Sequence, residues 1–445
     1  MSNSRKNMAL GVFLLGAGHH AAAWRHQEAN ARGNIDFRQL VQLAQTAERG
    51  KLDMVFIADA LAVGRSLSSI EHNVGGALEP FSLLSALAAV TEQIGLVATS
   101  STTYNEPFHT ARKLATLDHI SDGRSGWNIV TTGTEAEAHN FGRETNLAHE
   151  LRYERAGEFV KVVKELWDSW EDTALLADKA SGIYADLDKV REIDYKSDWF
   201  TVKGPLDVPR PPQGYPVLIQ AGSSPAGQAF AASIAEVVFT AQQTIEEAKH
   251  FYQSVKGQLA SFGRAEHGLL IMPGISPILG ATEQEAREKQ QELDALVLPH
   301  VAVAQLSGLL NFNLASYDLD GPLPSIPLPE ASTSGVISRI KMLVSLAEKE
   351  ELTIRQLSQR VIGARGHKTF VGTAVQLADL MEEWFRQGAC DGFNLMPPLL
   401  PSGLDEFVDE VVPELQKRGL FRTQYSGTTL RDHLGLSSPY PAYRT

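Results

Sequence analysis

The feature that most constrains the fold of this chain is a regular alternation of short apolar runs with segments of helical periodicity. Each run is rich in β-branched residues and is followed by a polar or glycine-rich turn and then by a helical pattern. Strands that alternate with helices in this way form parallel βαβ units, and eight such units predict a closed (β/α)₈ TIM barrel. The eight runs are Met8–Leu15, Met54–Ala58, Ile94–Ser101, Ser125–Thr131, Pro216–Gln220, Val237–Ala241, Leu269–Ile275 and Gly392–Met396.

Two longer stretches interrupt the repeat, at about residues 171–213 and 298–366. The first is polar, and we expect a short hairpin around Asp198–Val208. The second contains a proline-rich loop and two amphipathic helical patterns. No linker separates them from the rest, so residues 1–445 are expected to form a single barrel domain with two insertions, and long inserted loops are usually functional. The tail after Arg422 is loop-like, and we expect it to wrap a neighbouring subunit.

The composition excludes several classes of protein. Lys and Arg number 40 against 53 Asp and Glu, and the resulting net charge of −13 disfavours nucleic acid and anionic membrane surfaces as partners. The single cysteine, Cys390, excludes an internal disulfide or a multi-thiolate metal site and fits a reducing, cytoplasmic compartment. No apolar run approaches the roughly 18 residues of a membrane span.

The N-terminus allows a second interpretation. Arg5 and Lys6, followed by the apolar stretch from Met8 to Gly18, resemble a secretory signal. The turn that follows contains His19 and His20, which a signal would normally lack. A first barrel strand is therefore the favoured prediction.

A barrel enzyme builds its active site from residues at the carboxyl ends of its strands. His19 and His20 follow the first strand and could be metal ligands, acid–base groups or structural residues, but no inward cluster of Asp or Glu accompanies them at ligand spacing, so no metal site is predicted. Asp59 ends the second strand, either at the barrel mouth or as a loop cap. Thr99 lies in a row of small hydroxyl residues, and Asn128 needs a partner if buried, either a ligand or the backbone.

Two further segments are candidate anion sites. Ser223 and Ser224 stand where the fifth strand turns into a helix, a position where free N–H groups and the helix dipole favour phosphate; a simple helix cap is the alternative. His149 and Tyr153 precede a helical pattern at Glu154–Trp170, and their spacing of four would place them on one helix face. Together these residues could form a phosphate clamp, although a plain surface helix would also explain the pair.

Several common motifs are missing from the sequence. Phosphate-loop, dinucleotide-binding, zinc-protease and nucleophile-elbow patterns do not occur at the required spacing, which weakens the corresponding predictions.

From about Met8 to Leu436 the chain resembles the two-component, flavin-dependent monooxygenases of the bacterial luciferase superfamily. Within them it is most similar to the branch that contains the nitrilotriacetate, EDTA and dibenzothiophene sulfone monooxygenases. Many ordered segments carry the resemblance: Gly18–His26, Phe56–Asp59, Thr99–Tyr104, His109–His119, Asp122–Thr131, Asn140–Gly142, His149–Tyr153, Gln220–Ser224, Asp391–Asn394 and Val412–Leu420.

The resemblance implies a barrel with insertions that binds FMN at its mouth. Carried over by position, Asp59 and Thr99 would approach the isoalloxazine, and Asn128 would lie near the ring. The phosphate would be held by His149, Tyr153 and Ser224, with help from Ser223. His20 or His19 is the candidate proton donor. The resemblance does not decide which of these two adjacent residues occupies the position.

The resemblance also implies the reaction and the partners. A separate NAD(P)H-dependent flavin reductase would supply FMNH₂, O₂ would add at flavin C4a, and the hydroperoxide would transfer one oxygen atom to a small organic substrate such as an aminopolycarboxylate or an organosulfur compound. A homodimer or homotetramer is expected. The alternatives are a deazaflavin-dependent oxidoreductase of the same superfamily and a flavin-binding protein without turnover.

The residues do not name the substrate. The net charge does not favour an anion globally, although Arg25, Arg65 or Arg112 could neutralise a carboxylate locally.

Overall fold

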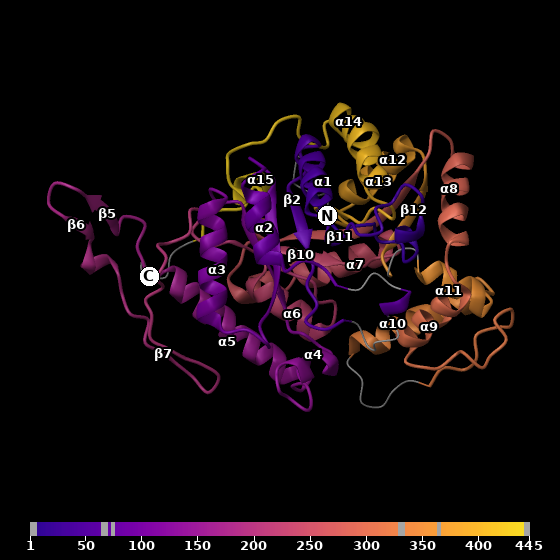
Figure 1. Ribbon diagram of the computed structural model, residues 1–445, viewed down its shortest axis with the longest axis horizontal. Helices are drawn as coiled ribbons and strands as arrows, with labels where there is room; N and C mark the ends of the chain where they lie inside the picture. Colours follow the sequence, from indigo (N-terminus) through magenta and orange to yellow (C-terminus); the bar gives the residue numbers. More distant parts are fainter. Residues whose placement is uncertain (1–6, 64–69, 73–75, 328–333, 363–365, 440–445) are drawn as a thin grey trace.

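The eight predicted strands form a closed parallel barrel in the computed structural model, which describes residues 7–63, 70–72, 76–327, 334–362 and 366–439, with the backbone alone for 334–339 and 361–362. Each strand pairs with the next in chain order, and the last pairs with the first. The predicted TIM barrel is therefore confirmed (Figure 1). Its strands are β1 (Ala9–Phe13), β2 (Met54–Ile57), β3 (Gly95–Ser101), β4 (Ser125–Val130), β9 (Val217–Gln220), β10 (Val237–Thr240), β11 (Leu270–Leu279) and β13 (Gly392–Leu395).

Both faces of the barrel strands are apolar, which explains why the sequence shows continuous rather than alternating apolar runs. Val12, Val55 and Leu96 point outward into the core shared with the helices. Phe56 and Val97 point inward and fill the barrel. The first apolar segment, assigned above to a core strand rather than a signal, is this buried β1.

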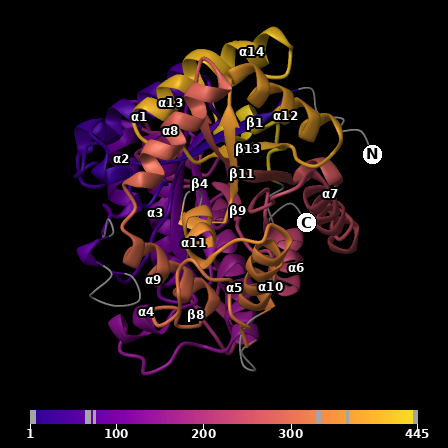
Figure 2. The same ribbon diagram turned by 90° about the vertical axis from the view of Figure 1, so that its right-hand side faces the viewer.

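Helices cover the outside of the barrel between successive strands (Figures 1 and 2). Many of them begin with a side-chain cap; for example, Asp36 caps α1, and Thr373 and Gln376 form a capping box on α12. The helices that surround the barrel are α1 (Phe37–Arg49), α2 (Pro80–Ala88), α3 (Pro107–Ile120), α5 (His149–Trp167), α6 (Pro225–Ile234), α7 (Ile245–Lys256), α8 (Glu283–Ala295), α12 (Ala374–Arg386), α13 (Ser402–Glu406) and α14 (Val412–Lys417).

A ninth strand, β12 (Lys368–Gly372), was not predicted. β11 is ten residues long, and only its first half closes the barrel; its second half extends past the mouth and pairs with β12. The register places Ser276 beside Thr369. This extension builds one wall above the barrel mouth.

The first insertion forms two hairpins away from the mouth. β5 (Leu175–Asp178) and β6 (Ile183–Ala185) pair in an arm that projects from the molecule (Figure 1). β7 (Tyr195–Lys196) and β8 (Thr201–Val202) form the second hairpin, a few residues earlier than predicted.

The second insertion folds into helices beside the mouth. These are α9 (Pro299–Leu310), α10 (Ser334–Lys349) and α11 (Ile354–Ile362), of which α9 was not predicted. Buried side chains from all three, including Leu306, Leu343 and Leu357, form an apolar cluster of their own. The insertion therefore has its own small core, and Figure 2 shows it below the strands as a separate layer.

The tail closes the bottom of its own barrel, so for residues 422–439 the expectation that it wraps a neighbouring subunit is wrong. α15 (Leu430–Leu434) lies at the amino ends of the strands, and the fully buried Leu430 packs with the residues that fill the barrel. A Cβ on Gly95 would collide with Leu430. Arg431 anchors the segment through both oxygens of Glu236.

We expect Leu430→Ala to lower the free energy of unfolding by about 3 kcal/mol, because it leaves a cavity between the plug and the barrel. Urea denaturation of the two proteins measures the change. Leu187→Ala is the matched control, since Leu187 is 83% exposed and its truncation should be neutral. Equal midpoints for Leu430→Ala and wild type would show that the tail does not support the barrel.

Among the described residues no single helix has the length and apolar character to cross a membrane; α8 and α9 meet those criteria only when taken together, and they are bent by 90° at the break between them.

Candidate active site

Polar residues meet inside the barrel near its mouth, where β3 and β4 lie side by side. Thr99 and Asn128 are register partners on these strands, and both are buried. Asn128 Nδ2 donates to Thr99 Oγ1 at 2.9 Å. The other side-chain atom, Asn128 Oδ1, is buried and has no hydrogen-bond partner among the described residues. A buried acceptor of this kind needs a donor, which a bound heterocycle could supply.

The candidate anion site gathers at the start of α6. Ser224 caps this helix by accepting from Gly227 N at 3.1 Å, so the simple helix-cap interpretation holds for its hydroxyl. A Cβ on Gly227 would lie 3.0 Å from Tyr153 Oη and 2.9 Å from Gly222 Cα, so glycine allows the tyrosine hydroxyl to approach the helix start. His149 is the first residue of α5, and its ring centroid lies 5.0 Å from that of Tyr153.

The structure therefore brings three of the four predicted clamp residues into one place. Tyr153 Oη approaches the amino end of the ten-residue α6, His149 packs on the Tyr153 ring, and Ser224 is the N-cap. The helix dipole favours an anion there, although Pro225 has no N–H and Gly227 N already donates to Ser224 Oγ. Ser223 is exposed beside them and contributes its carbonyl to Gln228 Nε2 at 3.0 Å. The helix containing His149 begins five residues earlier than predicted, which is why the spacing of four places the two rings in contact.

Asp59 lies on the exposed rim just after β2. Partial removal from water raises the pKa of its carboxyl, the backbone N–H of Ala60 opposes this, and the carboxylates of Glu79 and Glu137 raise it further. Asp59 is not joined to Thr99 or Asn128 by a hydrogen bond in the described part of the chain. Its place in a binding site remains a prediction.

The two adjacent histidines have different surroundings. His19 Nε2 lies 2.9 Å from the carbonyl oxygen of Phe13, and its ring packs edge-on against that phenyl ring. His20 Nε2 lies 3.2 Å from Asp294 Oδ1, and His20 Nδ1 accepts from Ala22 N at 3.3 Å. The hydrogen bond to Nδ1 places the proton of a neutral His20 ring on Nε2.

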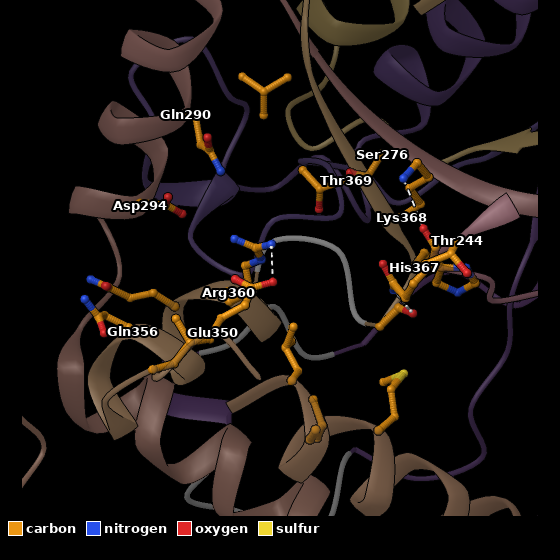
Figure 3. A pocket seen from close by; sticks show the side chains of 18 of the residues that line it. Thr244, Ser276, Gln290, Asp294, Glu350, Gln356, Arg360, His367, Lys368 and Thr369 are labelled. Atoms are coloured by element: carbon orange, nitrogen blue, oxygen red, sulfur yellow. Dashed lines mark hydrogen bonds and ion pairs between the residues drawn. The ribbon is translucent and has the colours of Figure 1, made fainter. Parts of the chain in front are cut away.

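A cavity of about 1070 Å³ opens between the barrel mouth and the second insertion, and His20 lines it whereas His19 does not. Figure 3 shows Gln290 and Asp294 of α8 on one side and Ser276, Lys368 and Thr369 of β11 and β12 on the other. His367 also lines it, with its ring stacked 4.9 Å from Phe239. A concave site of this size beside the barrel mouth has room for a small organic molecule.

Sequence reasoning missed the far wall of this cavity. Ser276 belongs to the extension of β11, His367 directly precedes β12, and Lys368 begins it. The short run at β12 did not stand out from the insertion around it. The length of the apolar run from Leu269 to Leu279, more than twice that of its neighbours β9 and β10, was the available signal.

Two of the three arginines suggested for charge neutralisation, Arg25 and Arg112, do not line the cavity. Arg25 donates to the backbone carbonyl of Leu296, and Arg112 pairs with Asp207 at 2.9 Å on the outer surface. Arg65 lies outside the described residues. In the described ranges, no group of three or more His, Cys, Asp or Glu side chains could hold a metal ion.

Comparisons with known proteins match nearly the whole chain. A family model described as luciferase-like monooxygenase matches residues 8–390. The chain is 52% identical over 444 residues to N-acetyl-S-(2-succino)cysteine monooxygenase of Bacillus subtilis (strain 168), with 100% of each chain covered. It is 49% identical over 446 residues to nitrilotriacetate monooxygenase component A of Aminobacter aminovorans, with 98% of each covered. A crystal structure of riboflavin lyase with modified FMN and riboflavin superposes with a TM-score of 0.84 at 32% identity, covering 97% of this chain and 96% of that one.

Proposed function

The chain belongs to the luciferase-like monooxygenase family, and on that premise we propose that it is the oxygenase component of a two-component system. It takes FMNH₂ from a separate NAD(P)H-dependent flavin reductase and uses O₂ to insert one oxygen atom into a small organic substrate. The Aminobacter relative is named as component A of its monooxygenase, which supports a partner reductase. The riboflavin lyase, a relative of the same fold crystallised with a modified FMN, supports the flavin.

The single observation that carries the proposal is the fit of a flavin to two separated features of the mouth. Asn128 Oδ1 is a buried acceptor that lacks a donor, as a site for the polar edge of a heterocycle requires. The Tyr153 hydroxyl, with His149 packed against its ring, lies beside the start of α6, where the helix dipole would favour a phosphate. A ligand with a heterocycle at one end and a phosphate at the other matches both.

On this proposal the chain binds, orients and shields its cofactor. Asn128 and Thr99 would face the ring from inside the barrel, Asp59 would face it from the rim, and His149, Tyr153, Ser223 and Ser224 would hold the phosphate. Reduced flavin supplies the electrons that activate O₂. The α9–α11 insertion covers the neighbouring cavity and would keep bulk water from the reacting atoms. At the cavity wall, the Nε2–H of a neutral His20 would donate to Asp294 Oδ1, 3.2 Å away, while Nδ1 accepts from Ala22 N.

The substrate proposed here is an aminopolycarboxylate or an organosulfur compound. Both classes occur in the names of the two relatives, one of which acts on nitrilotriacetate and the other on a succinylated cysteine. We further propose that the protein is cytoplasmic and works as a homodimer or homotetramer. Light scattering of the purified chain would measure the oligomeric state.

The direct test of the proposed function is oxygen insertion. The purified protein, a flavin reductase, NADH and FMN are incubated under ¹⁸O₂ with members of both substrate classes, and products are analysed by mass spectrometry. We expect one ¹⁸O atom per product molecule and no product without the reductase. The proposal would be overturned if no substrate gave a labelled product and if the protein did not accelerate the oxidation of reduced flavin.

We expect Asn128→Leu to lower the affinity for FMNH₂ roughly tenfold, because one hydrogen bond to the ring is lost. The same change should alter the melting temperature of the cofactor-free protein only slightly, because removal of a buried acceptor without a partner offsets the loss of the hydrogen bond to Thr99 Oγ1. Anaerobic titration and a thermal melt measure the two effects. A loss of stability without a loss of affinity would assign Asn128 to the core alone.

A further inference from the structure

A second cavity lies beside α3 and α5, two neighbouring helices on the outside of the barrel (Figure 1). Its volume is about 490 Å³. It is lined by the turn after β3, the first half of α3, the segment after α4 (Glu135–Asn140) and one residue of α5. Its lining residues include none of those proposed above to hold the cofactor. A ligand in this cavity would therefore be additional to the flavin.

The α5 residue that lines this cavity is Arg155, which is only 7% exposed. Its guanidinium is stacked against two phenyl rings, with the central carbon 4.7 Å from the ring centre of Phe200 and 5.8 Å from that of Phe159. Nη1 is buried and has no hydrogen-bond partner in the described part of the chain. The rings cover the faces of the guanidinium, but they leave the N–H donors at its edge without an acceptor. A buried donor of this kind needs one.

Cations outnumber carboxylates around the cavity. Arg155, Arg143 and Lys113 line it against the single carboxylate of Glu106, an excess of two positive charges, and His109 adds to this excess when it is protonated. Burial lowers the pKa of the Arg155 guanidinium; Glu106 opposes this effect, and Arg143 adds to it. The net charge of the whole chain is −13, so this concave site has the opposite sign and concentrates anions.

The start of α3 also lies at the wall of the cavity. Glu106 is the N-cap residue of this fourteen-residue helix, but its side chain accepts no hydrogen bond from the first turn. Glu106 and His109, one turn apart, both line the cavity. The positive end of the helix dipole stabilises an anion at this place. The uncapped helix start and the buried guanidinium are independent features that favour the same kind of ligand.

We propose that this cavity is a second anion site, which binds the phosphate group of a small molecule. A phosphate carries about two negative charges on one group, which matches the excess of two positive charges. Its oxygens also suit the planar donor edge of a guanidinium. Arg155 is the buried contact, and Lys113 and Arg143 are exposed at the rim. The volume leaves room for the remainder of a nucleotide, so free phosphate and a nucleotide phosphate are the two sources of this chemistry.

Isothermal titration of the FMN-saturated protein tests the site while flavin occupies the mouth. The probes are inorganic phosphate, adenosine 5′-phosphate, adenosine and succinate. We expect saturable binding of both phosphates, with affinities that fall as salt is raised, and no binding of adenosine. Succinate should bind more weakly, because its two charges lie on separate carboxylates. Tighter binding of adenosine 5′-phosphate than of inorganic phosphate would identify a nucleotide as the source, and the reverse order or equality would identify free phosphate.

We expect Arg155→Met to weaken the binding of inorganic phosphate roughly 10- to 100-fold, because methionine keeps an apolar contact with the two rings and supplies no donor. Lys113→Met and Arg143→Met should each weaken it about two- to fivefold, since both side chains are exposed. The matched control is Arg112→Met, which removes the same charge from the same helix at a position that does not line the cavity. Its affinity for phosphate should equal that of wild type.

Three results would overturn the inference. The first is the absence of saturable binding of either phosphate, and the second is wild-type affinity in Arg155→Met. The third is tighter binding of succinate than of phosphate. If Arg155→Met does not fold, the double variant Lys113→Met/Arg143→Met decides by the same comparison with Arg112→Met.

Tyr153→Phe separates this site from the proposed cofactor site, because Tyr153 lies at the barrel mouth and does not line the second cavity. This variant should bind FMNH₂ more weakly and inorganic phosphate as wild type does. A loss of phosphate binding in Tyr153→Phe with none in Arg155→Met would place the phosphate at the mouth and contradict a second site.

Discussion

The double variant His149→Ala/Tyr153→Phe is expected to bind FMNH₂ roughly 10²- to 10³-fold more weakly than wild type, because it removes two side chains that would contact the phosphate, and hydrogen bonds to a charged group contribute about 1.5–3 kcal/mol each. The Tyr153 hydroxyl lies at the start of α6, and the His149 ring packs against the Tyr153 ring. Anaerobic titration of the reduced flavin measures the loss.

Reduced riboflavin is the matched ligand for this test, since it has the same ring and no phosphate. Its affinity should change by less than about twofold in the double variant, because no hydrogen bond to the phosphate exists to be lost. Tyr184→Phe is the matched protein control, because Tyr184 is 67% exposed on β6, far from the mouth. An equal loss for FMNH₂ and reduced riboflavin would show that the double variant damages the fold, and no loss for either would place the phosphate elsewhere.

Replacing His20 by Gln is expected to lower kcat for product formation by roughly 10²-fold, at the low end of the range for a lost acid–base group. Its Nε2 carries the proton at the cavity wall, while Nδ1 is engaged by Ala22 N. The affinity for FMNH₂ should be unchanged, since His20 is not among the residues proposed to hold the cofactor. Steady-state turnover with excess FMNH₂ measures kcat.

Two histidine variants serve as comparisons. His19→Gln should retain kcat within a few fold, because His19 faces the Phe13 carbonyl and does not line the cavity. His250→Gln, on the exposed surface of α7, should have no effect. If His20→Gln keeps wild-type turnover while His19→Gln loses it, the assignment of the two histidines must be exchanged.

The barrel could be predicted from the sequence because each of its strands is buried on both faces. A strand such as Val217–Gln220 is then a continuous apolar run, and its partner helix shows the complementary period. The strand β12 was not predicted because its side chains are only partly buried. Its pairing with the second half of β11 is also a non-local contact, which the periodicity of the sequence does not indicate. The tail was misplaced for a similar reason, because Leu430 packs against Gly95 and Gly126, which are distant in the chain.

The candidate site likewise has a part that the sequence predicts and a part that it does not. Asn128 lies within a predicted strand, Ser224 follows one, and Tyr153 directly precedes a predicted helix, so the barrel topology brings them toward the mouth. Ser276 and Lys368 line the neighbouring cavity from the end of β11 and from β12, whose pairing follows no simple repeat. The proposed cofactor end was therefore accessible from the sequence, whereas the proposed substrate end required the structure.

Anaerobic titration of the purified protein with FMNH₂, set against the reduced deazaflavin cofactor under the same conditions, tests the central claim most directly. We expect saturable, stoichiometric binding of FMNH₂ and markedly weaker binding of the reduced deazaflavin. No binding of FMNH₂, or tighter binding of the deazaflavin, would contradict the assignment of this barrel mouth to reduced FMN.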